Sequence, residues 1–318
     1  MNRSPEFNHL INLIVHLSPV REIELALIPI IDINLTDVLN HTPIDYASTV
    51  NPCVEVIEAL IKAGSRVDYS LLREAVIHNP NPEIAITLYR LISPLTQNDI
   101  DYLFLMAVSN RSDTSLLHYF VKEGANIHTL IGMDLYPEWE EDLDWEGEEN
   151  DFTLVEQNAL VVAMYENPHP IKMVRELIAL GVDVNHRDAL GNSVISHSLD
   201  DLSLLKVLVE EGKAHLHTFD SGGKTPLMSA CEGENIEVAL YLISKESEIN
   251  TLSIEHKTAL HYALMCHLTN NYKVVKSLID HGSDVNIVDG DGNSPLMIAR
   301  NHFAYSEIIA LLEKQSIS

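Results

Sequence analysis

Thr225-Pro-Leu-Met-Ser-Ala230 returns twice more along the chain, as Thr258-Ala-Leu-His-Tyr-Ala263 and as Ser294-Pro-Leu-Met-Ile-Ala299. The copies start at residues 225, 258 and 294, so they lie 33 and 36 residues apart. Each copy follows a polar turn and precedes two short helical patterns. Self-similarity at this period predicts a stack of two-helix units instead of one globular core. We therefore expect function on a repeated surface rather than in a catalytic pocket.

The copy that begins at Asp220 shows the pattern of one unit. Asp220-Ser-Gly-Gly-Lys224 is a polar turn that contains glycine. Thr225 is suited to cap a helix through its hydroxyl, and Pro226 suits the first helical position because it lacks an N–H. Apolar residues at helical spacing then predict two helices, the second starting near Ile236. Their buried faces are expected to contain Leu227, Ala230 and Cys231, and then Val238, Ala239, Leu242 and Ile243.

A glycine closes the second helix of several units. It ends Leu60-Ile-Lys-Ala-Gly64, Leu177-Ile-Ala-Leu-Gly181 and Leu278-Ile-Asp-His-Gly282. The last two are followed by the extended segments Val182-Asp-Val-Asn185 and Ser283-Asp-Val-Asn286. Because a helix often ends on a left-handed residue, these glycines mark helix carboxyl ends.

These residues resemble the ankyrin repeats, whose pattern is a turn with Asp and Gly, then Thr-Pro-Leu-His-x-Ala, and a second helix that ends before an Asp-Val-Asn segment. Thr258–Ala263 and Gly282–Asn286 match closely, and Asp289–Ala299 matches almost as well. The resemblance implies an all-α ankyrin-repeat solenoid of stacked helix-turn-helix units with hairpin or loop fingers. It also implies that His261 is the buried histidine that bonds to its own turn.

The pattern divides the chain into four parts. Agreement with the repeat is poorer before residue 150, and the last repeat lacks an exit segment, so it is expected to be a cap with an outer helix from Ser306 to Glu313. About eight repeats are predicted, starting near Asp37, Tyr69, Asp99, Thr153, Asp188, Asp220, Ser253 and Asp289. The expected parts are N-terminal capping helices (1–36), divergent repeats (37–128), an acidic insertion with tryptophans (129–152) and repeats with a C-terminal cap (153–318).

The insertion departs most from the repeat. Asp134–Asp151 contains ten acidic residues, no basic residue and both tryptophans of the chain. A run of like charges is usually a solvated loop or an interaction segment. Tryptophans within it suit contact with a basic protein surface, and the alternative is that they tether the loop to neighbouring repeats. The resemblance implies a finger beside the face where the family holds its partners. The expected contact residues are Trp139, Glu140, Glu141, Asp142, Asp144, Trp145 and Glu146.

The charge of the whole chain is one-sided. Among 318 residues, 47 are Asp or Glu and 20 are Lys or Arg, which gives a formal net charge of −27. Such a surface repels phosphate backbones, so direct binding of nucleic acid is disfavoured. A basic protein partner would instead be attracted. The alternative is that the acidity only keeps a long repeat array in solution.

Cysteine usage and hydropathy indicate an intracellular protein. Cys53, Cys231 and Cys266 include no close pair and are typical of reduced packing residues. No stretch approaches the roughly 18 apolar residues of a membrane span. The apolar run Leu10 to Leu17 is short and lacks a cleavage site, so no signal peptide is expected. We expect a cytoplasmic chain that is monomeric in isolation and does not contact a membrane.

No pattern in the sequence predicts catalysis, a cofactor or a metal site. Gly-rich phosphate loops, His-Glu-x-x-His and Gly-x-Ser-x-Gly are absent. The pattern of Asp289–Asn293 is similar to that of a calcium-binding loop, but Arg300 occupies the position that requires a bidentate acidic ligand. His215 and His217 are only two candidate ligands, too few for zinc. An enzyme or ligand-binding activity in the divergent segment 69–151 is the alternative from another functional class.

The resemblance implies a non-catalytic module that binds a protein partner through its concave face and acidic finger. The candidate contacts on the fingers are Asn192, Lys224, Lys257 and Asn293. Those on the inner helices are Tyr165, Glu166, Asp200, Asp201, Glu232, Met265 and Asn301. The acidity favours an inhibitor or immunity protein of a basic toxin or nuclease. The alternative is an effector or adaptor scaffold that grips a host or cellular protein.

Overall fold

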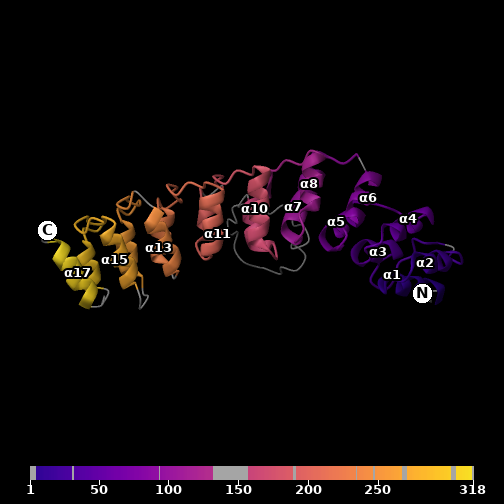
Figure 1. Cartoon of the computed structure of the whole chain (residues 1–318), viewed down its shortest axis with the longest axis horizontal. Helices are drawn as coiled ribbons and strands as arrows, with labels where there is room; N and C mark the ends of the chain where they lie inside the picture. Colours follow the sequence, from indigo (N-terminus) through magenta and orange to yellow (C-terminus); the bar gives the residue numbers. More distant parts are fainter. Residues whose placement is uncertain are drawn as a thin grey trace, which may run out of the picture. The chain divides into compact units, whose positions relative to one another are not determined.

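The computed structural model describes residues 5–30, 32–92, 94–131, 157–188, 191–233, 235–245, 248–266, 271–301 and 306–316. Its contacts separate the chain into two compact units. The N-terminal unit comprises Met1–Thr129 with Glu166–His169, and the C-terminal unit comprises Leu130–Tyr165 with Pro170–Ser318. Each unit is a series of helix pairs (Figure 1).

The N-terminal unit contains four helix pairs. In each pair the first helix packs on the second. The first helices of neighbouring pairs also pack on one another, and so do the second helices. The pairs are α1 (Pro5–Val15) with α2 (Val20–Leu27), α3 (Pro43–Val50) with α4 (Val54–Lys62), α5 (Tyr69–His78) with α6 (Pro82–Ile92), and α7 (Gln97–Asn110) with α8 (Ser115–Lys122).

The C-terminal unit starts with a short antiparallel pair, β1 (Leu130–Ile131) and β2 (Gln157–Asn158), in which Leu130 faces Asn158. Helix pairs follow, again stacked in chain order. They are α9 (Ala159–Glu166) with α10 (Pro170–Leu180), the 3-10 helix η3 (Val194–Ser198) with α11 (Leu202–Lys206) and the π-helical η4 (Val207–Glu211), α12 (Pro226–Glu232) with α13 (Ile236–Lys245), α14 (Ala259–Met265) with α15 (Tyr272–Asp280), and α16 (Pro295–Asn301) with α17 (Ser306–Ser316).

Local chemistry sets the helix ends where the sequence predicts them. The Thr225 hydroxyl accepts a hydrogen bond from the Met228 N–H at 3.3 Å, and Pro226 opens α12. Four second helices end at glycines with positive φ, between +91° and +101°, a region that other residues rarely adopt. These glycines are Gly64, Gly124, Gly181 and Gly282.

The core is continuous within each unit because every helix buries an apolar stripe against its neighbours. In α12 the buried residues include Leu227, Ala230 and Cys231, as the repeat pattern predicts. In α13 they are Val238, Ala239, Leu242 and Ile243. The predicted all-α solenoid of helix-turn-helix units with fingers is confirmed.

Two elements differ from the simple pattern. The first helix after Asp188 is the 3-10 helix η3, where Val194 and Ile195 are β-branched and the Ser198 hydroxyl donates to the Ile195 carbonyl at 2.8 Å. Such residues and such local side-chain bonds disfavour a regular α-helix. The last helix, α17, extends to Ser316 and is longer than predicted.

Buried side chains link the pairs of the N-terminal unit at the carboxyl ends of the first helices. Asn51 Nδ2 donates to the Ile14 carbonyl at 2.9 Å, and Asn79 Nδ2 donates to the Ser48 and Asn51 carbonyls at 2.8 and 3.0 Å. We call this series, which continues with Arg111 and Asn167, the carboxyl-end ladder.

Side-chain donors to backbone carbonyls continue the ladder to the end of the unit. Arg111 Nη1 donates to the Val76 carbonyl at 3.3 Å, and Asn167 Nδ2 donates to the Arg111 carbonyl at 2.8 Å. The three asparagines each precede proline, which favours extended backbone and ends the helix. The Asn79 side chain also accepts from the Asn81 N–H at 2.9 Å, so both ends of its amide are used.

Candidate protein-interaction face

Four fingers of the C-terminal unit share one turn geometry. In the finger Asp220–Lys224, the Asp220 N–H donates to the Lys224 carbonyl at 3.0 Å, and the Asp220 carboxylate accepts from the Lys224 N–H at 2.8 Å. Backbone bonds from the first residue to the last repeat in the fingers 188–192, 253–257 and 289–293. The last finger residues therefore occupy equivalent places, and we call them the finger row: Asn192, Lys224, Lys257 and Asn293.

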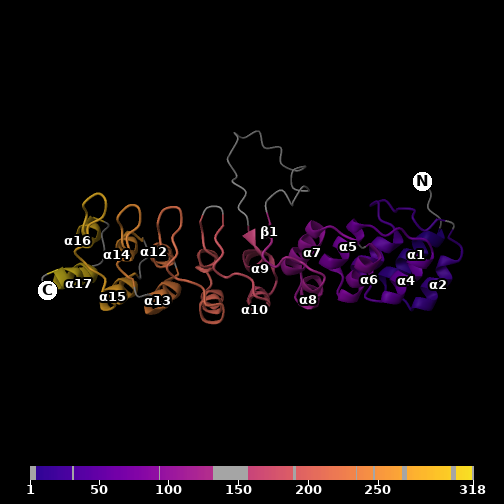
Figure 2. The same ribbon diagram turned by 90° about the horizontal axis from the view of Figure 1, so that it is seen from above.

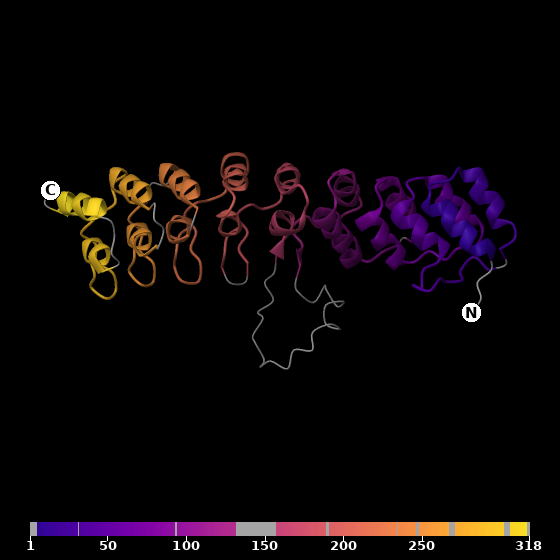
Figure 3. The same cartoon turned by 90° about the horizontal axis from the view of Figure 1, so that it is seen from below.

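The last three fingers are joined to one another. The Ile254 N–H donates to the Gly222 carbonyl at 3.3 Å, and the Gly290 N–H donates to the Glu255 carbonyl at 2.9 Å. Figures 2 and 3 show these fingers in a row on the side of α12, α14 and α16 that faces away from α13, α15 and α17. We define the finger ridge as residues 219–224, 252–257 and 288–293.

Five of the predicted contacts at the first helices form a second row. Each lies seven residues after the residue that precedes its first helix, so the five occupy equivalent places in the repeat. All of them are exposed except Met265, which is half-buried. We call this set the first-helix strip: Tyr165, Asp200, Glu232, Met265 and Asn301.

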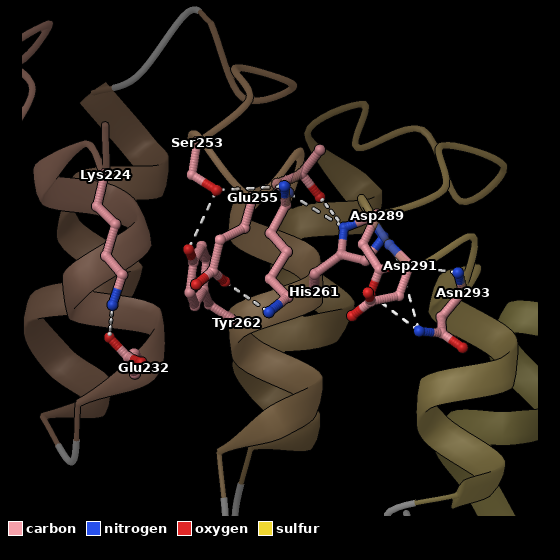
Figure 4. A network of polar contacts seen from close by, with 11 residues as sticks. Lys224, Glu232, Ser253, Glu255, His261, Tyr262, Asp289, Asp291 and Asn293 are labelled. Atoms are coloured by element: carbon pink, nitrogen blue, oxygen red, sulfur yellow. Dashed lines mark hydrogen bonds and ion pairs between the residues drawn. The ribbon is translucent and has the colours of Figure 1, made fainter. Parts of the chain in front are cut away.

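Lys224 and Glu232, predicted separately, form an ion pair across the two rows. Lys224 Nζ lies 2.6 Å from Glu232 Oε2 and 4.8 Å from the centre of the Tyr262 ring (Figure 4). Partial burial opposes the charge of the lysine, but the carboxylate prevails and raises the pKa of Lys224. The charge of Lys224 is therefore already balanced by a carboxylate of the same chain.

Lys257 is occupied in the same way. Its Nζ lies 2.6 Å from Glu255 Oε2, and the hydrogen bond to Glu255 raises the pKa of Lys257. The Tyr262 hydroxyl donates to Ser253 Oγ at 3.1 Å, which ties the first helix to the finger (Figure 4). Both lysines of the ridge, each partly buried, are thus paired with a glutamate of the same face.

His261 holds the start of α14, as the family resemblance implies. Its Nδ1 accepts from the Thr258 N–H at 3.1 Å, and the side chain is fully buried. Burial lowers the pKa of His261, although the Asp289 carboxylate acts in the opposite direction. Asp289 Oδ1 accepts from the N–H groups of Asp291 and Asn293 at 3.0 and 2.7 Å (Figure 4). Its carboxylate is therefore used within the turn.

A chain of polar contacts that the sequence pattern did not indicate connects Tyr165 to a finger. The Tyr165 hydroxyl lies 3.4 Å from His197 Nδ1, and His197 Nε2 lies 3.7 Å from Asp188 Oδ2. Burial lowers the pKa of His197, while Asp188 opposes that change. His197 stands four residues after Ser193, as Tyr262 stands four after Thr258, so the repeat alignment could have found it.

Some predicted contacts have local structural partners. Asp201 accepts from the Ser203 and Leu204 N–H groups at 2.7 and 3.2 Å and so caps α11. Asn192 and Asn293 donate to the carboxylates that open their own fingers. Glu166 is exposed at the end of α9 and groups with the N-terminal unit.

The predicted contacts of the acidic insertion lie outside the described residues. They are Trp139, Glu140, Glu141, Asp142, Asp144, Trp145 and Glu146. The strands β1 and β2 pair on either side of residues 132–156, and β2 runs directly into α9. The described residues on the two sides of the insertion are therefore adjacent, directly before the first helix α9, where other repeats carry a finger.

The described residues contain neither a candidate metal site nor a candidate membrane span. Across the described ranges, no three His, Cys, Asp or Glu side chains are grouped so that they could hold a metal ion. Among the helices of those ranges, none has the length and apolar character needed to cross a membrane.

Comparison with known proteins gives matches to ankyrin repeats. A family model described as ankyrin repeats matches three overlapping segments, residues 159–253, 193–289 and 245–317. An ankyrin repeat protein of Fowlpox virus is 32% identical over 134 residues, which cover 41% of this chain and 68% of the viral protein. The Escherichia coli ankyrin repeat protein YahD is 30% identical over 145 residues, or 44% of this chain and 71% of YahD.

A longer match extends into the N-terminal unit. An ankyrin repeat protein of Borreliella burgdorferi is 25% identical over 275 residues, which cover 79% of this chain and 63% of that protein.

Proposed function

Because this chain belongs to the ankyrin-repeat family, whose stacked repeats are protein–protein interaction modules, we propose that it binds a basic protein partner. The contact surface consists of the finger ridge and first-helix strip of the C-terminal unit together with the acidic segment Asp134–Asp151. The N-terminal unit is not part of the proposed contact surface. The repeat count of about eight and the boundaries at residues 36, 128 and 152 stay predictions.

The observation that carries the proposal is the distribution of charge. The acidic segment carries ten carboxylates and no cation. On the neighbouring repeats, Lys224 and Lys257 are already paired with Glu232 and Glu255. An acidic partner would find no available lysine on the ridge, whereas a basic partner would meet Asp200, which is exposed on the strip.

We further propose that the bound protein is a basic enzyme, such as a nuclease, that the chain inhibits. Carboxylates that imitate the charge of nucleic acid would occupy its cleft, and tryptophans would fill apolar pockets. The effector or adaptor role is the second candidate, since a gripping surface alone serves it equally well. Catalysis is not part of the proposal, because ankyrin repeats are typically a non-enzymatic scaffold.

Affinity purification from the native source tests the proposal. The full chain and a variant that lacks residues 134–151 serve as baits at about 50 mM and about 500 mM salt, because exposed charges are screened at high ionic strength. We expect basic proteins that are lost at high salt and lost with the deletion. Partners of neutral or acidic charge, or binding that survives both changes, would contradict it.

The inhibitor role needs a separate measurement. A purified basic partner with nuclease or other catalytic activity is assayed with an equimolar amount of the chain. Loss of activity supports inhibition, and full activity in the bound state supports the adaptor role instead. Circular dichroism of the deletion variant checks that the repeats remain folded.

A further inference from the structure

Half-exposed apolar side chains follow the finger ridge. Phe219, Leu252 and Val288 each come directly before the first residue of a finger, and 41%, 44% and 51% of their surfaces are exposed. The three fingers are hydrogen-bonded in chain order, so these residues follow one another along the ridge. Ile254 in the middle finger is 70% exposed. We call these four residues the apolar row.

The fold does not require apolar residues at these places. The residues that directly precede two other fingers are Thr36 and Arg187, both polar. The Arg187 guanidinium even donates along the stack, to the Phe219 carbonyl at 3.2 Å. The residue directly before the finger is therefore apolar in the last three fingers and polar in these two. Exposed apolar side chains that recur at one position of neighbouring fingers are more typical of a binding site than of a packing need.

The row is held rigidly. The bonds of Ile254 to Gly222 and of Gly290 to Glu255 fix the spacing of the fingers. Gly223 has φ +67°, and a Cβ there would meet the Ile254 backbone nitrogen and Cγ1 at 3.0 Å. The fingers thus approach as closely as glycine allows. A surface ordered before binding loses little entropy when a partner docks.

Charge selects the occupant. The ridge carries Asp220, Glu255, Asp289 and Asp291 against two lysines. Both lysines are neutralised by ion pairs, with Glu232 for Lys224 and Glu255 for Lys257. Apolar side chains in an acidic frame complement a segment that carries apolar groups between cations.

We propose that the apolar row binds one segment of the partner protein whose apolar side chains are flanked by Lys or Arg. This inference rests on the proposed function and adds a requirement to it. Charge alone attracts a partner to this face, and the apolar side chains of the segment determine which partner stays. The row supplies a short-range contact of its own, separate from the contacts proposed for the acidic insertion.

Selection from a library of random twelve-residue peptides displayed on phage tests this inference. The full chain is the bait, and selected peptides are then measured by fluorescence anisotropy. The test variant is Phe219→Ser with Leu252→Ser and Val288→Ser. A matched control carries Leu25→Ser, Leu35→Ser and Leu91→Ser, because these apolar N-terminal residues are at least as exposed as the three of the row. Neither variant changes the net charge, so binding by charge alone is unaffected.

We expect the selected peptides to combine apolar residues with Lys or Arg. They should bind the wild type and the control alike and lose at least about tenfold in affinity on the test variant, as expected when apolar burial at three side chains is removed. Equal binding to all three proteins, or an absence of enriched peptides, would overturn the inference. Thermal unfolding of both variants confirms that they are folded.

The variant that lacks residues 134–151 separates this inference from the proposed function. If the row acts as proposed, the peptides keep their affinity for that variant within about threefold. Peptides lost only with the deletion would overturn the row and leave the basic-partner proposal intact. Peptides that require the row but carry no cation would overturn the inference as stated and contradict the basic partner.

Discussion

The two units connect neighbouring repeats in different ways. In the N-terminal unit, a buried side chain at the carboxyl end of a first helix, such as Asn79, donates to carbonyls of the preceding pair. In the C-terminal unit the residues that end α12 and α14 are Gly233 and Cys266, and backbone bonds between fingers connect the repeats. One repeat type can thus place its connecting hydrogen bonds in the core or at the edge. The edge arrangement orders the fingers that are proposed to bind a partner.

The largest effect is expected from removing a rung of the buried ladder. Asn79→Ala leaves buried carbonyls of the preceding pair without a donor and should lower the free energy of unfolding by about 3 kcal/mol. The matched change at the end of α14, Cys266→Ala, removes one weak sulfur contact at 3.7 Å and should cost below about 1 kcal/mol. Urea denaturation followed by circular dichroism measures both. Equal costs would remove the distinction between the units.

Finger spacing should respond to an added methyl group. Gly223→Ala strains a positive φ and crowds Ile254, so we expect a loss of about 2 kcal/mol. Gly124 in the N-terminal unit has φ +101° with open space around it, and Gly124→Ala should cost only about 1 kcal/mol. Thermal unfolding compares the two variants. A cost at Gly124 as large as that at Gly223 would mean that the fingers are not in close contact.

Breaking the Lys224–Glu232 pair should change stability little and binding more. Lys224→Met should alter the free energy of unfolding by less than about 1 kcal/mol, because the pair is partly exposed. It releases the Glu232 carboxylate, so a basic partner should bind more tightly. Isothermal titration calorimetry with the purified partner measures the change. Weaker binding would show that the partner uses the lysine itself and is not selected by negative charge.

The smallest effect concerns pH. The pKa of His261 is lowered by burial, so the unfolded chain takes up a proton that the folded chain refuses as pH falls through about 6.5. The wild type should therefore lose stability below about pH 7 relative to His261→Gln, whose amide oxygen can still accept from Thr258 but does not titrate. The urea midpoints of the two proteins are compared from about pH 8 to about pH 5.5, the range in which a histidine titrates. If the difference between the two midpoints does not change with pH, the folded protein accepts the charged form of His261, and this explanation is wrong.

The repeat pattern was a strong guide to the fold. Thr225 and Pro226 start a helix, and Gly64 and Gly282 end one, because these residues act through their own backbone. The ladder was not predictable in this way. Asn79 has meaning only when the preceding repeat supplies its carbonyls, and the sequence does not display that neighbour.

The candidate site shows the same limit. Lys224 and Glu232 were nominated as contacts by their places in the repeat, but their pairing depends on how a finger folds over a helix. His197 was missed because its partners, Tyr165 and Asp188, come from two other elements. The family resemblance indicated which face to consider. It did not indicate which charges on that face are already balanced.

Hydrogen–deuterium exchange of the full chain, with and without the purified basic partner, tests most directly whether the C-terminal face is the binding surface. The account predicts slower exchange in residues 219–224, 252–257 and 288–293 when the partner is present, and no change in α2, α4, α6 and α8. Protection confined to those second helices of the N-terminal unit would contradict it.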